Sequence, residues 1–258
     1  ETIHLYDLLE IQKIREPEIQ IVSNLSFLPV NENNLVYKAA RLLQEEFALT
    51  DGISVKLTKR IPVAAGMAGG STDAAAMLYA MNQLYDLGLS RRELMKRGVQ
   101  IGADVPYCLM RGTALAEGIG EKLTQLPPMI KCPVLIAKPS ISVSTKFVYQ
   151  NLKLDEQTNH PDIDALMKDI REKDFDGVCA HMGNVLESVT IPNYPVIAEI
   201  KQQMMRSGAQ ASMMSGSGPT VFGLFEDGET AKRALREMKR SGLAKQVYLT
   251  TIYNNRRK

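Results

Sequence analysis

The fold of this chain is decided by one glycine-rich stretch, Pro62-Val63-Ala64-Ala65-Gly66-Met67-Ala68-Gly69-Gly70-Ser71-Thr72-Asp73. Before it, residues 53–58 alternate apolar with polar side chains, which is typical of a half-buried strand. After it, residues 73–87 carry apolar side chains at helical spacing, and Gly88 is placed to end that helix. The sequence therefore predicts a strand, a loop and a helix in direct succession.

A loop of this kind can bind phosphate, because free backbone N–H groups converge at the positive end of the helix that follows. We expect Gly66, Gly69 and Gly70 to adopt positive φ and to let phosphate oxygens approach closely. Ser71 and Thr72 are expected to add hydroxyl groups at the cap. The alternative is an ordinary turn in which one of these two residues is a plain N-cap. The Walker and Rossmann glycine patterns are both absent from the sequence, so those two nucleotide-binding classes lose their main support.

The flanking segments predict further elements of mixed type. We expect strands at residues 3–8 and 18–23, then a helix over residues 35–47 with Asn33 or Asn34 as its N-cap. Residues 90–93 read Ser-Arg-Arg-Glu, the form of a capping box that starts another helix. Two prolines near residue 127 then predict a domain boundary, with one domain at 1–128 and another at 129–258.

The second domain has the pattern of helices packed on a mostly antiparallel sheet. Its predicted strands are residues 133–137, 220–225 and 246–252. Its predicted helices are residues 163–170, 175–185, 196–204 and 231–238. The predicted fold class is therefore α+β.

The composition excludes several kinds of protein. The 258 residues are 45% hydrophobic with a net charge of +2, which allows a buried core and leaves no basic surplus for nucleic acid. The sequence has no run near the roughly 20 apolar residues that span a membrane. Its three cysteines lack the spacing of a structural metal site or a disulfide framework. We therefore expect a cytoplasmic protein that binds neither nucleic acid nor membranes.

Four motifs together resemble those of the GHMP kinases. Residues 62–75 resemble the family's second motif, Pro-x-x-x-Gly-Met-Ala-Gly-Gly-Ser-x-Asp-Ala-Ala, which binds ATP. Gly102-Ala103-Asp104-Val105-Pro106 and Gly118-Ile119-Gly120-Glu121-Lys122-Leu123 resemble segments of the members that act on a cytidyl diphosphate sugar alcohol. Met214-Ser215-Gly216-Ser217-Gly218-Pro219-Thr220-Val221-Phe222 resembles the family's third motif. Four motifs in the family's order are far more specific than one glycine loop.

This resemblance implies a two-domain α+β fold and a kinase activity. The N-terminal domain should be like the second domain of ribosomal protein S5, and the C-terminal domain should be ferredoxin-like. The activity implied is phosphorylation by ATP, with Mg²⁺, of the 2-hydroxyl of a small-molecule substrate, a cytidyl diphosphate sugar alcohol, in the non-mevalonate isoprenoid pathway.

The resemblance assigns Asp104 to catalysis and to contact with the acceptor. A carboxylate can accept the hydroxyl proton as the γ-phosphoryl group is transferred. From the residues alone, the favoured role of Asp104 is N-cap of a helix that starts at Val105-Pro106, and the resemblance reverses that preference. The two roles can coexist.

Other site residues are also implied by the resemblance. Pro62 to Thr72 would cradle the triphosphate, with Ser71 as a candidate metal contact and the remaining metal ligands open. Gly216 and Ser217 would approach the phosphates, and Thr145 and Tyr149 would bind the acceptor, Tyr149 by stacking on cytosine. Asn34 and Lys59 would contact adenine, against the alternatives of a helix cap and a solvated charge at a strand end.

Two other motifs of the family do not occur in the chain: a Pro-x-Lys-x-Asn-like stretch and a Gly-Tyr-His stretch. Because residues 3–8 read as a strand already under way, we expect these motifs and the first strands to lie upstream of Glu1. Without that lysine, the 258 residues should bind nucleotide weakly and turn over poorly. The alternative is a degenerate relative that no longer catalyses.

Three functions remain open from the sequence. The first is the cytidyl substrate kinase, the second is a GHMP kinase for homoserine or mevalonate-type alcohols, and the third is a binding module on the same fold. The Gly-Ala-Asp-Val-Pro segment favours the first, and the near-neutral charge disfavours an RNA-binding module. The sequence does not indicate an oligomeric state.

Overall fold

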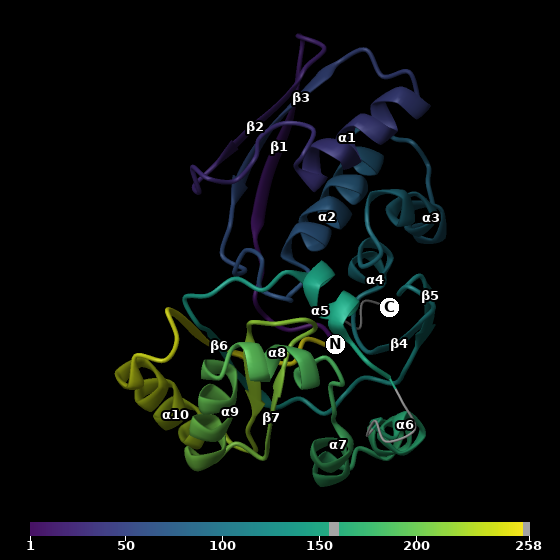
Figure 1. The fold of residues 1–258 in the computed structure, drawn as a ribbon. Coiled ribbons are helices and arrows are strands. Elements are labelled where there is room, and N and C mark those ends of the chain that lie inside the picture. Colours follow the sequence, from purple (N-terminus) through teal and green to yellow (C-terminus); the bar gives the residue numbers. More distant parts are fainter. Residues whose placement is uncertain (155–159, 255–258) are drawn as a thin grey trace. The chain divides into compact units, whose positions relative to one another are not determined.

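The computed structural model describes residues 1–154 and 160–254. The chain forms two compact units, each described here by itself (Figure 1). The N-terminal unit comprises Leu5–Val63 and Ala68–Gln125, and the C-terminal unit comprises Glu1–His4, Ala64–Met67 and Leu126–Lys258. The tip of the glycine-rich stretch therefore belongs to the C-terminal unit, whereas the helix start that follows it belongs to the N-terminal unit.

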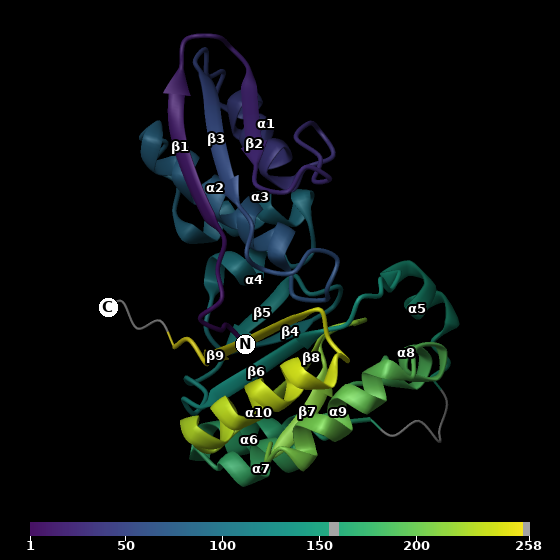
Figure 2. The same cartoon turned by 90° about the vertical axis from the view of Figure 1, so that its left-hand side faces the viewer.

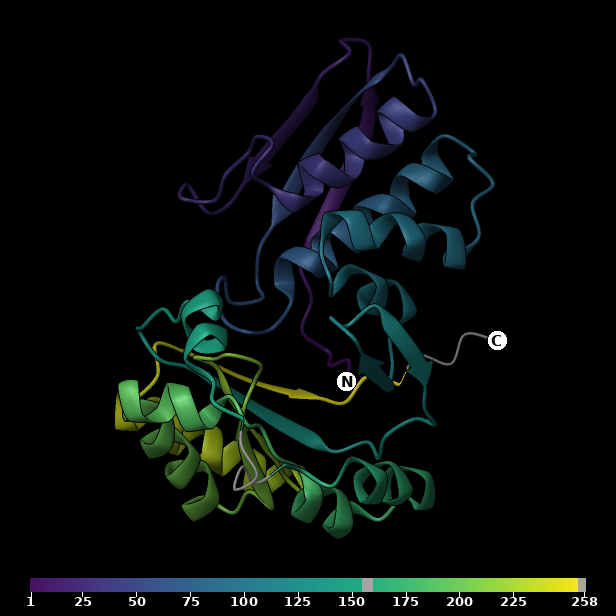
Figure 3. The same cartoon turned by 45° about the vertical axis from the view of Figure 1, so that its right-hand side comes forward.

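The N-terminal unit is a three-stranded sheet with helices on one face (Figure 1 and Figure 3). The strand order is β1-β3-β2, in which β3 is antiparallel to β1 and parallel to β2. Its strands are β1 (Leu8–Ile14), β2 (Ile19–Ser23), β3 (Gly52–Thr58) and the separate hairpin β4 (Ala114–Glu117) and β5 (Lys122–Gln125). Its helices are α1 (Leu35–Glu46), α2 (Gly69–Leu84), α3 (Arg91–Ile101) and α4 (Val105–Met110).

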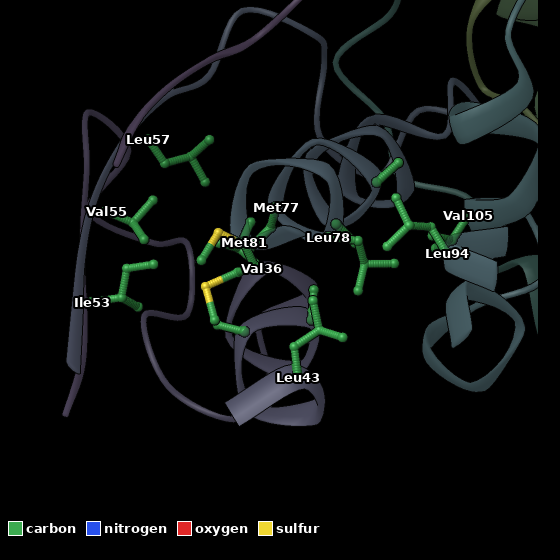
Figure 4. Packing of buried hydrophobic residues seen from close by; sticks show 14 of the residues in the cluster. Val36, Leu43, Ile53, Val55, Leu57, Met77, Leu78, Met81, Leu94 and Val105 are labelled. Atoms are coloured by element: carbon green, nitrogen blue, oxygen red, sulfur yellow. The ribbon is translucent and has the colours of Figure 1, made fainter. Parts of the chain in front are cut away.

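The core of this unit follows from the alternation predicted for residues 53–58. Ile53, Val55 and Leu57 are buried on one face of β3 and point toward helix side chains that include Met77 and Met81 of α2 (Figure 4). The intervening side chains face the other side of the sheet, because successive strand residues point to opposite faces. The period-two pattern thus fixes which face of the sheet carries α1 and α2.

The C-terminal unit is a four-stranded antiparallel sheet with helices on both faces (Figure 2). The order β7-β8-β6-β9 is that of a ferredoxin-like sheet, as the resemblance implied. Helices α9 and α10 pack on the face that carries Leu135, and α6 and α7 pack on the face that carries Val134 and Ile136. The strands are β6 (Pro133–Lys138), β7 (Ala211–Met214), β8 (Val221–Leu224) and β9 (Gln246–Thr251). The helices are α5 (Thr145–Asn151), α6 (Ile163–Glu172), α7 (Phe175–His181), α8 (Glu187–Asn193), α9 (Val196–Arg206) and α10 (Gly228–Ser241).

The predicted α+β class and the antiparallel second sheet are confirmed, and so is the capping box of Ser90 and Glu93. The first predicted strand is wrong, since Ile3 forms only an isolated bridge with Ile252 and β1 begins at Leu8. In the described parts of the chain, none of the helices has the length and apolar character that crossing a membrane requires.

Two helix boundaries also differ from the prediction. The helix expected at 73–87 spans Gly69–Leu84, because Asp86 turns the chain with φ 50° before Gly88 is reached. The helix expected at 175–185 ends at His181, because Met182 adopts an extended backbone with ψ 134°. Hydrophobic spacing marks neither change, since it continues past both ends.

Candidate active site

The glycine-rich stretch makes its turn with alanines as well as glycine. Positive φ occurs at Ala64 (50°), Gly66 (69°) and Ala68 (50°), whereas Gly69 and Gly70 are the first two residues of α2. The expectation of positive φ was therefore right for Gly66 and wrong for Gly69 and Gly70. Two alanines hold a left-handed conformation that usually favours glycine, which is a form of strain common at ligand-binding loops.

Close packing explains the glycine at position 69. A β-carbon there would lie 2.9 Å from Cγ2 of Ile61 and 3.3 Å from Nζ of Lys59. At Gly70 a β-carbon would lie 3.4 Å from Cδ1 of Leu35. These glycines let the start of α2 approach the end of β3 closely, rather than letting the loop turn.

The start of α2 presents an open set of donors. Its N-cap is Ala68, which has no capping side chain, so the predicted caps Ser71 and Thr72 are wrong. The N–H of Thr72 bonds to the carbonyl of Ala68, whereas the N–H groups of Gly69, Gly70 and Ser71 have no partner within residues 1–154 and 160–254. Free N–H groups at the positive end of a 16-residue helix have the geometry and charge that suit an anion.

The two hydroxyls at this helix start differ in availability. Thr72 Oγ1 donates to the carbonyl oxygen of Ala68 (3.0 Å) and lies 3.4 Å from Sγ of Cys108 in α4. Ser71 Oγ makes no hydrogen bond with any described residue. Ser71 is therefore the hydroxyl that a phosphate or a metal ion could contact.

Asp104 lies two residues after Gly102, which is close to this helix start. A β-carbon built on Gly102 would be 3.9 Å from Ser71 Oγ, and α4 begins three residues beyond Gly102, directly after Asp104. Asp104 occupies the N-cap position of α4, but its side chain makes no capping hydrogen bond and the residue is exposed. The capping alternative is therefore wrong for the side chain, and the carboxylate is free to act on a ligand.

Lys59 is at the centre of a buried charged cluster. Its Nζ bonds to Asp7 and lies 2.7 Å from Oδ2 of Asp73, and the three side chains are 1% to 4% exposed. The alternative of a solvated charge is therefore wrong. Asp7 also accepts hydrogen bonds from the backbone N–H groups of Arg60 and Ile61. This cluster ties the start of β1, the end of β3 and the start of α2 together.

Asp73 carries the excess negative charge of this cluster. Burial raises its pKa to about 7, and the ammonium of Lys59 opposes this rise only in part. Its Oδ1 is buried and has no hydrogen-bond partner among the described residues. Two carboxylates against one ammonium leave one charge uncompensated, so a proton on Asp73 near neutral pH relieves the cost of burial.

Asn34 is committed to its helix. Its Oδ1 accepts from the N–H of Val36 (2.9 Å) and its Nδ2 donates to the carbonyl oxygen of Pro29 (2.7 Å). The side chain is thus the N-cap of α1, as the alternative prediction stated. The contacts of Asn34 and Lys59 with adenine stay predictions.

The third motif lies against the glycine-rich tip within the C-terminal unit. Ser215 Oγ donates to the carbonyl oxygen of Gly66 (2.8 Å), and a β-carbon on Gly66 would lie 2.2 Å from the carbonyl oxygen of Ser215. Gly216 and Gly218 have φ of 55° and 87°. The N–H groups of Gly216 and Ser217 have no partner in the described chain, so this loop is a second set of open donors.

Thr145 and Tyr149 are both on α5. The Oγ1 of Thr145 lies 2.9 Å from Oγ of Ser217, which joins α5 to the third motif. Tyr149 is 61% exposed, so its ring is available for stacking. The structure thus brings Ser71 close to Gly102, two residues before Asp104, in one unit, and places the third motif against Gly66 and Thr145 in the other.

Several contributing residues were not predicted as site residues. Asp7 and Asp73 pair with Lys59, and Asn184 and Glu187 bind the backbone of the third motif. Asp73 stands in the family's motif, but no local pattern shows that it is buried. The described residues contain no cluster of three or more His, Cys, Asp or Glu side chains that could hold a metal ion.

Comparison with family models and known proteins identifies similar chains. Residues 34–112 match the GHMP kinases N terminal domain, and residues 166–244 match the GHMP kinases C terminal domain. A 4-diphosphocytidyl-2-C-methyl-D-erythritol kinase of Lachnospira eligens is 57% identical over 98% of this chain and 88% of its own length. The enzyme of the same name from Lachnoclostridium phytofermentans is 53% identical over 99% of this chain and 88% of its own length.

Solved structures agree with this likeness. A crystal structure of 4-(cytidine 5'-diphospho)-2C-methyl-D-erythritol kinase matches with a TM-score of 0.83 and 28% identity, over 98% of this chain and 88% of that chain. A homoserine kinase from Cytophaga hutchinsonii matches with a TM-score of 0.80 and 22% identity, over 95% of this chain and 86% of that chain. The homoserine kinase likeness concerns the fold alone.

Proposed function

The chain belongs to the GHMP kinases, and on that premise we propose that it phosphorylates the 2-hydroxyl of 4-diphosphocytidyl-2-C-methyl-D-erythritol with ATP. The observation that carries this proposal is 57% identity to the Lachnospira eligens kinase across 98% of the chain. The reaction is a step of the non-mevalonate isoprenoid pathway.

Two loops, one in each unit, offer free N–H groups that suit the phosphates of a nucleotide. The start of α2 offers the N–H groups of Gly69, Gly70 and Ser71, and the third motif offers those of Gly216 and Ser217. Donors of this kind suit phosphate oxygens, because the helix dipole and the unpaired N–H groups both favour negative charge. These loops are the proposed triphosphate contacts.

Asp104 is the proposed proton acceptor. As the acceptor oxygen bonds to the γ-phosphorus, the bond from that phosphorus to the β–γ bridging oxygen breaks and ADP leaves. The hydroxyl proton passes to the carboxylate of Asp104, which is exposed and not used as a cap. Ser71 Oγ, which has no protein partner among the described residues, is the proposed contact for Mg²⁺. The ion would neutralise charge on the phosphates.

The acceptor is proposed to contact α5. Tyr149 presents an exposed ring, and stacking of a pyrimidine on an aromatic ring contributes about 1–3 kcal/mol. Thr145 Oγ1 is already paired with Ser217 Oγ, so an acceptor bound there would lie beside the third motif.

The experiment is an ADP-release assay with three acceptors offered separately: the cytidyl substrate, homoserine and mevalonate. It is run on the 258-residue chain and on a version in which any residues that precede the matching region in the Lachnospira eligens relative are placed before Glu1 as an added N-terminal segment, because two motifs of the family do not occur in the chain. We expect release only with the cytidyl substrate, and faster release with the added segment. Turnover of homoserine or mevalonate in its place would overturn the proposal.

A further inference from the structure

The last residue of an edge strand has an unusual pair of partners. Met214 ends β7, which lies at the edge of the sheet and has no neighbouring strand on its outer side among the described residues. Its N–H donates to Glu187 Oε1 (2.7 Å), and its carbonyl oxygen accepts from Asn184 Nδ2 (2.8 Å). Two side chains spaced three residues apart thus replace the missing strand, at the point where the third motif begins.

Asn184 uses all the hydrogen-bonding groups of its amide. The second hydrogen of Nδ2 is donated to the carbonyl oxygen of Gly216 (2.8 Å), and Oδ1 accepts from the N–H of Leu186 (3.0 Å). The two carbonyl groups that accept these hydrogens, at positions 214 and 216, lie on either side of the residue at which the chain leaves β7 and enters the turn with positive φ. A carboxylate of the same shape keeps the acceptor and loses both donors.

These contacts orient the loop. Carbonyl oxygens of the loop turn toward residues 184–190, since Thr190 Oγ1 also donates to the carbonyl oxygen of Ser217 (3.3 Å). The N–H groups of Gly216 and Ser217 are left without partners in the described chain. Ser215 Oγ then reaches the carbonyl oxygen of Gly66. Asn184 therefore supports the loop from the side opposite its open donors.

We propose that Asn184, together with Glu187, is a positioning residue for ATP: it holds the third motif so that the N–H groups of Gly216 and Ser217 face the triphosphate. The inference rests on the proposed function, because it takes this loop to be a phosphate site. Asn184 itself need not touch the nucleotide.

The test is the affinity of the 258-residue chain for a non-hydrolysable ATP analogue, measured by calorimetry for the parent and for Asn184→Asp. We expect the Kd to rise at least about tenfold, because two hydrogen bonds to the loop are lost and a carboxylate is placed beside two carbonyl oxygens. The matched control is Asn193→Asp, in which an amide of α8 loses a bond to the carbonyl oxygen of Val189 (2.7 Å) without contacting the loop. Its Kd should equal that of the parent.

A second variant keeps the inference testable if Asn184→Asp folds poorly. Ser215→Ala removes only the bond to Gly66 and should raise the Kd by a few-fold, about 2–5, with the contacts of Asn184 intact. The inference would be overturned if Asn184→Asp folds and has the parent's Kd. If Asn184→Asp is unfolded, the inference would be overturned by a Ser215→Ala variant whose Kd equals that of the parent. A parent that does not bind the analogue even with the added N-terminal segment would instead overturn the proposed function.

Discussion

The starts of α2 and α4 both carry an aspartate, and the surroundings of the two carboxylates are opposite. Asp73 in α2 is buried and paired with Lys59, whereas Asp104 before α4 is exposed and caps nothing with its side chain. The two helices pack together, with Thr72 Oγ1 lying 3.4 Å from Sγ of Cys108. Burial and pairing thus separate a carboxylate that holds the scaffold from one that is free to react.

The largest effect that we expect is the loss of kcat when Asp104 is replaced. Asp104→Asn should lower kcat by about 10²–10⁴, because the amide keeps the shape of the side chain and loses the base. The KM values for ATP and the cytidyl substrate should change little. Steady-state kinetics in the version with the added N-terminal segment measure this, and thermal unfolding should give the parent's midpoint. An active Asp104→Asn would remove Asp104 from catalysis.

The next largest effect is expected on stability, at Lys59. Lys59→Met leaves two buried carboxylates without their ammonium, and removing one partner of a buried ion pair costs about 3–5 kcal/mol. Urea unfolding at neutral pH measures the loss. The control is Lys56→Met in β3, the strand that Lys59 directly follows. Lys56 pairs with Glu10 and both side chains are more than half exposed, so about 0–1 kcal/mol is expected. Equal losses for the two variants would show that the cluster does not support the unit.

Much of the fold could be predicted from the sequence, because the periodic elements pack on one core. The alternation over residues 53–58 and the helical spacing after Asp73 depend on which side chains face that core, and burial confirms both. The first turn of α2 could not be predicted, because glycines give no apolar signal and the residues that require them, Ile61 and Lys59, contact them only in the folded chain.

The candidate site was predicted by motif and not by geometry. The motifs predict that Asp104, Ser71 and Gly216 lie beside a ligand, but no pattern in the sequence shows whether an aspartate is buried. Asp7 is 52 residues from Lys59, and Asn184 is 32 residues from Gly216. Such pairings depend on tertiary packing, so a local reading offered only a solvated charge as the alternative role of Lys59 and left Asn184 without a role.

The pH dependence of the free energy of unfolding tests the role of the buried carboxylate, Asp73. Because the folded pKa of Asp73, about 7, lies above its ordinary value of 3.8, its contribution to stability is fully present below pH 3.8. That contribution is lost as the pH rises through 7. Asparagine does not titrate and so does not lose stability in this way. The free energy of unfolding of Asp73→Asn should therefore rise by about 1–3 kcal/mol relative to that of the parent as the pH rises from about 5 to about 8.

Urea unfolding at several pH values measures this difference for Asp73→Asn. The matched control is Asp104→Asn, which removes an exposed carboxylate from the same unit. A constant difference between Asp73→Asn and the parent across this pH range would mean that Asp73 is already ionised when folded, with Lys59 compensating it fully.

The smallest expected effect is on the free energy of unfolding, at two residues that both occupy N-cap positions but differ in whether the side chain makes a capping hydrogen bond. Ser90 before α3 makes a capping bond to the N–H of Glu93 (3.3 Å), whereas Asp104 before α4 makes none. Ser90→Ala should therefore lower the free energy of unfolding by about 0.5–2 kcal/mol. Asp104→Ala should change it by less than about 0.5 kcal/mol, because no hydrogen bond is lost and the site is exposed. Urea unfolding of the two variants under one condition compares them directly. If Asp104→Ala cost as much as Ser90→Ala, its carboxylate would be a structural cap in solution, and the contrast with Asp73 would then rest on burial alone.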